Sequence, residues 1–181
     1  MTISEYLLKM KGSTKSPPGV GIGELAWSWL GSVIGIGLCG YLSSRYFEPR
    51  DLSLIIGSFG ASAVLLYGAI KSPLAQPRNL LGGHVLSALI GVACFQLFGT
   101  TIWIASALAV SLAVVAMLAT KTLHPPGGAT ALIAVIGGAK VHSLGFYYAL
   151  LPAGAGAVIL LVVALLVNNL SRTRKYPEYW L

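Results

Sequence analysis

Charge is scarce in this sequence, and acidic charge is scarcest. Of 181 residues, 12 are Lys or Arg and 5 are Asp or Glu, so 9% are charged, against about 25% in soluble domains. With 56% hydrophobic residues and a mean hydropathy of +0.80, the composition excludes an ordinary soluble domain and predicts one membrane domain. The net charge of +7 does not indicate nucleic-acid binding, because the basic residues lie between apolar segments, where they set membrane topology.

The few acidic and thiol side chains narrow the chemistry further. Apart from Glu24 at the edge of the first apolar segment, no Asp or Glu falls inside such a segment, which argues against a metal-cation site or a carboxylate proton pump. Cys39 and Cys94 lie within apolar segments and are expected to be buried thiols rather than a disulfide or a metal pair. An enzyme built on His124 would lack a nearby carboxylate or cysteine. We therefore expect no enzymatic activity, no cofactor and no metal.

Six apolar segments follow a polar N-terminal tail, residues 1–23, in which no cleavable signal peptide is evident. They span about 24–45, 52–70, 80–98, 101–120, 124–139 and 145–168. The first, third, fourth and sixth are long enough to cross a hydrocarbon layer of roughly 30 Å. The second and fifth are short and contain Gly or Pro, so the chain makes either four or six crossings.

Loop charges favour six crossings. Six crossings place nine basic residues on one side and three on the other, whereas four crossings give six and six. The positive-inside rule then puts both termini in the cytoplasm. The nine are Lys9, Lys11, Lys15, Lys71, Arg78, Lys121, Arg172, Arg174 and Lys175, and the three are Arg45, Arg50 and Lys140. In the C-terminal tail, 170–181, the basic residues are expected to be membrane-edge anchors, with Tyr176, Tyr179 and Trp180 at the interface.

A short internal repeat supports this count. The words GASAVL, from Gly60, and GATALI, from Gly128, match at an offset of 68 residues, which also places the third segment on the sixth. Three segments per repeat make the halves cross in opposite senses. The predicted fold is an all-α membrane protein with two inverted three-segment repeats, 24–98 and 99–169, in which segments two and five are broken into half-helices. Chance similarity in a low-complexity apolar sequence remains the alternative.

The two broken segments predict an anion site. Segment two enters at Asp51-Leu52 and begins a helix near Gly60, and segment five passes His124-Pro125-Pro126 and begins one near Gly128. Opposed helix N-termini near the membrane centre would offer unpaired N–H donors and partial positive charge to a monovalent anion. The substrate-binding candidates are Ser58, Gly60, Ala61, Ser62, His124, Gly127, Gly128, Ala129 and Thr130, and the gate or mouth candidates are Arg78 and Lys121.

Structural roles compete with this interpretation. Glycines on membrane helices often serve packing, which we expect for Gly31, Gly35, Gly154 and Gly156 and keep open for Gly60 and Gly128. The two prolines can simply start a helix. His124 is either a proton-linked gate or anion contact, or a donor to a backbone carbonyl. His84 and His142 are expected to be interfacial, and Asn79 to be a helix N-cap.

Three sequence motifs resemble those of a known family. The stretch from His124-Pro125-Pro126 through Gly127-Gly128-Ala129-Thr130-Ala131-Leu132 resembles the signature of the HPP family of small integral membrane proteins. The stretches Phe59–Leu65 and Ser72–Arg78 match its other recurring words, and the resemblance covers roughly residues 27–168. It implies a transporter, and its plant chloroplast and cyanobacterial members imply nitrite as the substrate.

The leading hypothesis is therefore a carrier or channel for a small inorganic anion, nitrite first. It would lie in a bacterial plasma membrane or an equivalent chloroplast membrane, surrounded by lipid and without nucleic acid. Six short helices make a thin wall around a central path, so a homodimer or homotrimer is expected. The competing hypothesis is an accessory membrane subunit without a solute path, whose glycines serve only helix packing.

Overall fold

The computed structural model describes residues 1–12, 14–50 and 53–181, and these residues form helices and connecting turns without a β-strand. The longer helices are α2 (Ile22–Leu42), α4 (Pro77–Phe98), α5 (Ile102–Ala119), α6 (Pro125–Ile136) and α8 (Ala155–Leu170). The shorter helices are α1 (Ile3–Lys9), α3 (Ser58–Ala63) and α7 (Gly138–Leu144). Wide π-type turns are η1 (Ser43–Phe47), η3 (Val64–Gly68) and η5 (Ala149–Gly154), and 3₁₀ turns are η2 (Glu48–Arg50) and η4 (Pro73–Ala75).

Four helical stretches among the described residues are long and apolar enough to cross a bilayer, namely Ile22–Phe47, Pro77–Phe98, Ile102–Ala119 and Ala149–Leu170. α6 and α7 together would make a fifth, but they are bent by 101° at their junction, and Ser58–Gly68 is a shorter apolar helix. The chain is thus a multi-pass integral membrane protein. The long segments one, three, four and six are confirmed, and segments two and five contain only short helices. The bend of segment five lies after α6, between Ile136 and Gly138, and not before Gly128 as predicted. The entry at Asp51-Leu52 lies outside the described residues.

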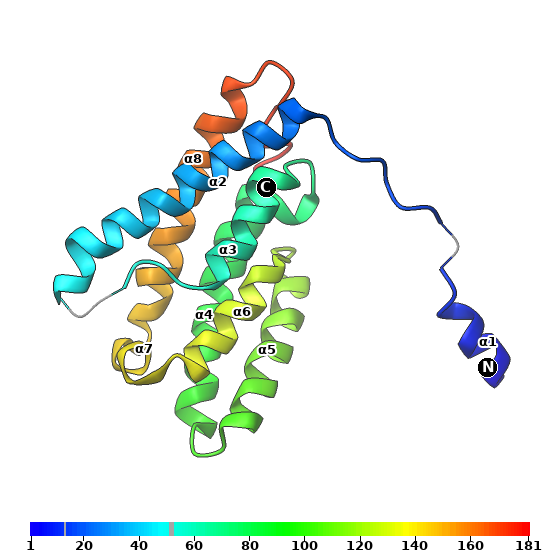
Figure 1. The fold of residues 1–181 in the computed structure, drawn as a ribbon. Coiled ribbons are helices and arrows are strands. Elements are labelled where there is room, and N and C mark those ends of the chain that lie inside the picture. The colour runs from blue at the N-terminus through cyan, green and yellow to red at the C-terminus, as the bar shows by residue number, and fades with distance from the viewer. Residues whose placement is uncertain (13, 51–52) are drawn as a thin grey trace.

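The bundle has two distinct ends (Figure 1). The start of α2, the end of η3, the end of α8 and residues 171–181 lie together at one end, which we call the tail side. The end of α2 and α7 lie toward the other end, which we call the opposite side. α3 runs toward the tail side and α6 runs away from it, so the two short helices point in opposite directions.

Prolines set where two of these helices begin. Pro77 starts α4 after Gln76, and Pro125 starts α6 after His124, whose extended backbone (φ −139°, ψ 104°) is the conformation that a following proline favours. Gln76, not Asn79, is therefore the N-cap of α4. Asn79 lies in the first turn, where its Nδ2 donates to the Leu123 carbonyl at 2.8 Å.

Small residues let α4 approach α6 closely. A Cβ on Gly91 would lie 2.5 Å from the carbonyl oxygen of Ala131, and one on Gly127 would lie 2.8 Å from the carbonyl oxygen of Gly83. Real Cβ atoms do not come this close, so both contacts require glycine. Such small-residue contacts replace the hydrophobic driving force that helices lack within lipid.

Two aromatic rings use glycine in the same way. Tyr67 lies across Gly31 and Gly35 of α2, and its hydroxyl donates to the Leu160 carbonyl of α8 at 3.1 Å. The Phe59 ring lies against Gly156 of α8. The packing role predicted for Gly31, Gly35 and Gly156 is therefore confirmed, whereas a Cβ on Gly154 would come closest to the Ala149 carbonyl of its own turn.

The C-terminal tail folds back onto the tail side of the bundle. Arg174 is 6% exposed, and its guanidinium lies 2.8 Å from the Glu24 carboxylate of α2. The same guanidinium donates to the Tyr67 carbonyl, to Asn168 Oδ1 and to Ser28 Oγ. The expectation of a membrane-edge anchor was wrong for this residue, because a carboxylate and four further oxygen acceptors, including the Glu24 carbonyl, surround it inside the fold.

Tyr176 also departs from its predicted place at the interface. Its side chain is buried, its hydroxyl donates to the Ala75 carbonyl at 2.7 Å, and burial raises the pKa of that hydroxyl. Trp180 is exposed, as is Tyr179, whose hydroxyl donates to the Pro73 carbonyl. The tail thus covers the turn around η4 instead of lying on lipid.

Candidate functional site

Five polar side chains meet in the interior of the bundle. Ser58 and Ser62 come from α3, His84 from α4, His124 from the loop before α6, and Thr130 from α6. Each is at most 1% exposed. Polar side chains inside a membrane domain are costly unless they bond to one another, so such a group calls for a functional hypothesis.

Ser62 joins the two histidines. Its Oγ lies 2.7 Å from Nε2 of His84 and 2.9 Å from Nε2 of His124. On the other face of His84, Nδ1 lies 2.7 Å from Oγ1 of Thr130, which donates to Ser58 Oγ at 2.9 Å. The contacts therefore form one continuous chain of hydroxyls and imidazoles.

The end of this chain is fixed by a backbone group. Nδ1 of His124 lies 2.8 Å from the carbonyl oxygen of Leu74, which can only accept a hydrogen bond. Nδ1 of His124 must therefore carry a proton. The sequence left open whether His124 donates to a backbone carbonyl, and this contact is of that kind.

Local geometry explains how the side chains converge. Ser58 and Ser62 are four residues apart on a helix, so they share one face. Ser62 meets His124 just before α6, while Ser58 meets Thr130 one turn further into α6. The first turns of α3 and α6 therefore lie side by side and antiparallel, rather than end to end as expected.

Apolar and aromatic groups enclose the cluster. The Phe59 ring meets His84 edge-on at a centroid distance of 5.3 Å, and the two imidazole rings are 5.1 Å apart. Gly83 lies directly against His124, where a Cβ would come 2.5 Å from the histidine Cβ. Tyr148 donates to the backbone carbonyl of Thr130 at 3.2 Å. This enclosure keeps bulk water from the imidazoles.

One buried hydroxyl beside the cluster lacks a partner. Ser87 of α4 is 0% exposed, and its Oγ makes no hydrogen bond to any described group. It lies against Gly127, where an added Cβ would come 2.8 Å from it. A buried hydroxyl without a partner is rare in proteins, so this oxygen has donor capacity left for a bound molecule.

The helix-end amides expected to hold an anion are largely occupied. Phe59 N donates to the Ile56 carbonyl, and Gly60 N donates to the Gly57 carbonyl. Gly127 N donates to the His124 carbonyl, and the two prolines before it have no N–H. The helices also begin at Ser58 and Pro125, slightly before the expected Gly60 and Gly128. The polar centre is therefore made of side chains, and the predicted site of exposed amides is corrected accordingly.

The structure brings together only some of the predicted site residues. Ser58, Ser62, His124 and Thr130 form the cluster, and Gly127 packs against α4 beside it. Gly60 and Ala61 instead face outward, and Gly128 and Ala129 are half-buried. A Cβ on Gly60 would meet no atom within 4 Å, so neither Gly60 nor Ala61 lines the cluster.

The two predicted gate residues lie at the tail side. Arg78 is positioned by its bond from Nη2 to the Thr120 carbonyl at 2.8 Å, and Lys121 is exposed in the following loop. Both precede the entrance to α6, and neither contacts the cluster.

His84 was missed because it was expected at the interface. It is fully buried and bridges α3 to α6, whereas His142, half-buried at the opposite side, bonds to the Val135 carbonyl. The available signal was an ionisable residue a few positions inside an apolar segment, flanked by Gly83 and Ser87 on one helix.

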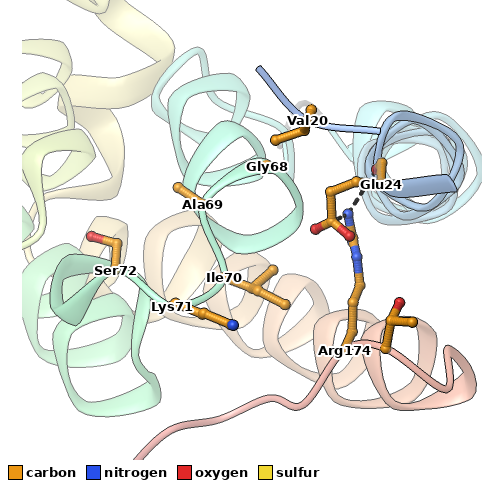
Figure 2. A pocket seen from close by; sticks show the side chains of 9 residues that line it. Val20, Glu24, Gly68, Ala69, Ile70, Lys71, Ser72 and Arg174 are labelled. Atoms are coloured by element: carbon orange, nitrogen blue, oxygen red, sulfur yellow. Dashed lines mark hydrogen bonds and ion pairs between the residues drawn. The ribbon is translucent and has the colours of Figure 1, made fainter. Parts of the chain in front are cut away.

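Two cavities lie at opposite ends of the bundle, near the two ends of the cluster. One of about 450 Å³ at the tail side is lined by Lys71, Ser72, Glu24 and Arg174. Figure 2 shows Lys71 and Arg174 on two sides of this cavity, with Glu24 paired to Arg174. Ser72 lies two residues before Leu74, whose carbonyl ends the hydrogen-bonded chain.

The second cavity, of about 470 Å³, lies at the opposite side. Its walls are mostly apolar and include Ser53, Gly57 and Lys140. Gly57 immediately precedes Ser58, the other end of the hydrogen-bonded chain. Each cavity thus includes a residue that is close in sequence to one end of the hydrogen-bonded chain, and each has at least one basic side chain in its lining.

Comparison with known proteins shows which family the chain belongs to. Two transmembrane proteins of Dictyostelium discoideum are 49% and 44% identical to the chain over 180 and 185 residues. The alignments cover 97% and 99% of this chain but 57% and 65% of those proteins, so the chain spans less than two thirds of their length. No solved structure matches it. The model of the HPP transmembrane region matches residues 17–177, so the chain belongs to the HPP family of integral membrane proteins.

Proposed function

We propose that this protein is a membrane transporter for a small monovalent anion, with nitrite as the first candidate. The observation that carries the proposal is the closed polar cluster in the interior, together with two cavities at opposite ends of the bundle that have basic side chains in their linings. A carrier must bind its solute at a site that opens to one side at a time. The conformation described here corresponds to the closed intermediate of such a cycle.

The chemistry of the cluster suits an anion better than a cation. Hydroxyls and protonated imidazole nitrogens are donors, and a small anion needs donors. No Asp or Glu is among the five side chains, so the cluster lacks the carboxylates that hold metal cations. No Lys or Arg is among them either, which favours a single negative charge and weak binding. Weak binding permits release on the far side.

The repeat and the loop charges support alternating access. The offset of 68 residues maps Ser58, the first residue of α3, onto Pro126, the second residue of α6. We therefore propose that segments two and five are equivalent broken segments of an inverted repeat, giving six crossings. With six crossings, the excess of basic residues on the side of the termini supports a cytoplasmic location for both. A lipid bilayer and a small inorganic anion are the partners this requires.

Anion flux into vesicles tests the proposal. The full chain, reconstituted in proteoliposomes, should take up nitrite faster than protein-free vesicles, which correct for diffusion of nitrous acid through lipid. Nitrate, formate and chloride, tested in the same way, would rank the substrate class. Absence of protein-dependent uptake for all four anions would reject the proposal.

An accessory membrane subunit is the second candidate. The observation that favours it is that the five side chains of the cluster bond to one another in one connected set, as in a purely structural polar core. Under this alternative, purified protein moves no anion, and a larger membrane partner co-purifies with it. Flux by the chain alone would exclude it.

A further inference from the structure

We propose that His84 and His124, bridged by Ser62, bind one proton together with the transported anion, so that proton and anion cross the membrane one to one. This inference rests on the proposed transport function and deepens it. It assigns His84 a role and sets the energetic coupling, which is electroneutral symport.

The proton count of the cluster carries the first step. Ser62 has a single hydroxyl proton and lies between two Nε2 atoms, so it cannot donate to both. Because Nδ1 of His124 is committed to the Leu74 carbonyl, a neutral His124 has Nε2 as an acceptor. Ser62 must then donate to His124, and His84 must donate to Ser62 from Nε2.

A neutral His84 with its proton on Nε2 has an acceptor at Nδ1. Thr130 would then have to donate to His84, so its hydroxyl hydrogen cannot also be donated to Ser58. The neutral cluster therefore requires Ser58 to turn and donate to Thr130 instead. In this arrangement, donation runs in one direction from Ser58 to Leu74.

One extra proton fills the same contacts with donation running in the opposite direction. His124 then carries protons on both nitrogens and donates to Leu74 and Ser62, Ser62 donates to His84, His84 donates from Nδ1 to Thr130, and Thr130 donates to Ser58. No contact is lost: a proton entering at Ser58 is passed from each group to the next, so that His84 receives one at Nδ1 and gives up the one at Nε2, and the hydroxyl hydrogens turn to their new acceptors. The cluster can thus gain or lose one proton without rearranging its heavy atoms.

The second step is the charge this proton brings. The groups packed around the imidazoles are Phe59, the Tyr148 hydroxyl on the Thr130 carbonyl and, beyond Leu74, the Tyr176 hydroxyl on the Ala75 carbonyl. Of the charged side chains, Lys121 lies three residues before His124 and Arg78 six residues before His84, and both are positive. The cationic Lys71 and the paired Arg174 line the tail-side cavity. Among the described residues, the acidic Glu5, Glu24, Glu48 and Glu178 lie in the tails, loops or helix ends.

An uncompensated charge inside a membrane protein is costly, and no carboxylate of the packed elements can compensate it. A bound anion is the remaining counter-charge, so proton and anion stabilise each other's binding. Ser87, whose buried hydroxyl has no partner, is the additional donor for that anion. The cluster therefore favours loading by both ions or by neither, and this is the condition for symport.

Proteoliposomes that report anion and pH together test the coupling. With the membrane potential clamped by potassium and valinomycin, nitrite uptake by the wild-type protein should acidify the lumen by one proton per anion after subtraction of protein-free vesicles. Changing the clamped potential should leave the rate unchanged, and an inward proton gradient should raise it. Uptake that follows the potential without moving protons would overturn the symport while leaving anion transport intact. No uptake of any anion would instead reject the transport function itself.

Variants locate the proton. His84→Gln and His124→Gln should each lose the dependence of uptake on the proton gradient. His142 is half-buried and lies outside the cluster, so His142→Gln should keep that dependence. A monodisperse elution profile in detergent shows that a variant is folded, so that loss of coupling can be told from loss of folding. The proton-to-anion ratio of the wild-type protein tests the proposal even if every variant misfolds. If folded His84→Gln keeps one proton per anion, His84 is not part of the proton site and the proposal fails.

Discussion

Arg174 Nη2 lies 2.8 Å from the Glu24 carboxylate, an ion pair that ties the C-terminal tail to the start of α2. The arginine side chain is 1% exposed and the glutamate side chain 34% exposed. The two ends of the membrane domain are thereby joined at the tail side. Both residues of the pair also line the tail-side cavity, together with Lys71.

Removing one partner of this pair should destabilise the protein unequally. Glu24→Gln leaves a buried guanidinium without its counter-charge, and breaking a buried pair in this way costs about 3–5 kcal/mol, with less expected here because Glu24 reaches solvent. Arg174→Gln loses the charge together with four hydrogen bonds and should cost at least as much. Thermal unfolding in detergent measures both. Arg172→Gln, at an exposed neighbour, is the control and should stay within about 0.5 kcal/mol of wild type. Equal stability of all three variants would show that the pair contributes nothing.

A matched pair of glycines tests the packing of α2. Gly35→Ala would place a methyl group into the Tyr67 ring and hydroxyl, whereas Gly37→Ala meets no atom within 4 Å. Overpacking a tight contact costs roughly 1–3 kcal/mol, so Gly35→Ala should lower the unfolding temperature and Gly37→Ala should not. Gly35→Ala combined with Tyr67→Phe removes the hydroxyl oxygen from the clash and should recover part of the loss. A stable Gly35→Ala single variant would contradict the close approach of α2 to η3.

Transport should depend on the buried hydroxyls and not on the outward-facing glycine. Ser62→Ala leaves both Nε2 atoms without their shared partner, a loss of about 1–3 kcal/mol that should reduce anion flux about tenfold or more. Gly60→Ala, on the exposed face of the same helix, should retain flux. Nitrite uptake in proteoliposomes with matched protein content compares the two variants. If Gly60→Ala reduced the flux and Ser62→Ala did not, the anion site would lie at the helix ends and not at the buried hydroxyls.

The sequence predicted what depends on local pattern. The length of the apolar segments predicted the long helices. The motifs that contain Gly and Pro predicted the starts of the short helices α3 and α6 to within a few residues. Ser62 and Thr130 were singled out correctly as interior hydroxyls because they follow those words in the first turns.

What escaped prediction depends on tertiary rotation and on distant partners. α4 is apolar nearly all round, so its sequence gives no phase that would turn His84 inward. Arg174 follows the default of a basic residue after a membrane helix, and only Glu24, far away in the chain, makes its burial favourable. The 101° bend before α7 arises at Gly138, whose φ of +78° is open to glycine, and a segment of uniform hydropathy does not reveal such a bend.

Six crossings with cytoplasmic termini predict a specific labelling pattern. Cys39 and Cys94 are buried, so a membrane-impermeant maleimide should react little with the wild-type protein in intact cells. Ser16→Cys and Lys175→Cys lie at exposed positions of the N- and C-terminal tails, and Ser143→Cys lies at an exposed position of α7 on the opposite side. Ser143→Cys should label in intact cells, because it lies on the side with fewer basic residues. The two tail variants should label only after permeabilisation.

If the tails label on different sides, the number of crossings is odd and the inverted repeat cannot hold. If both tails label from outside, the number of crossings is still even but the orientation is reversed, so the Lys71 cavity would face the exterior and receive the anion first.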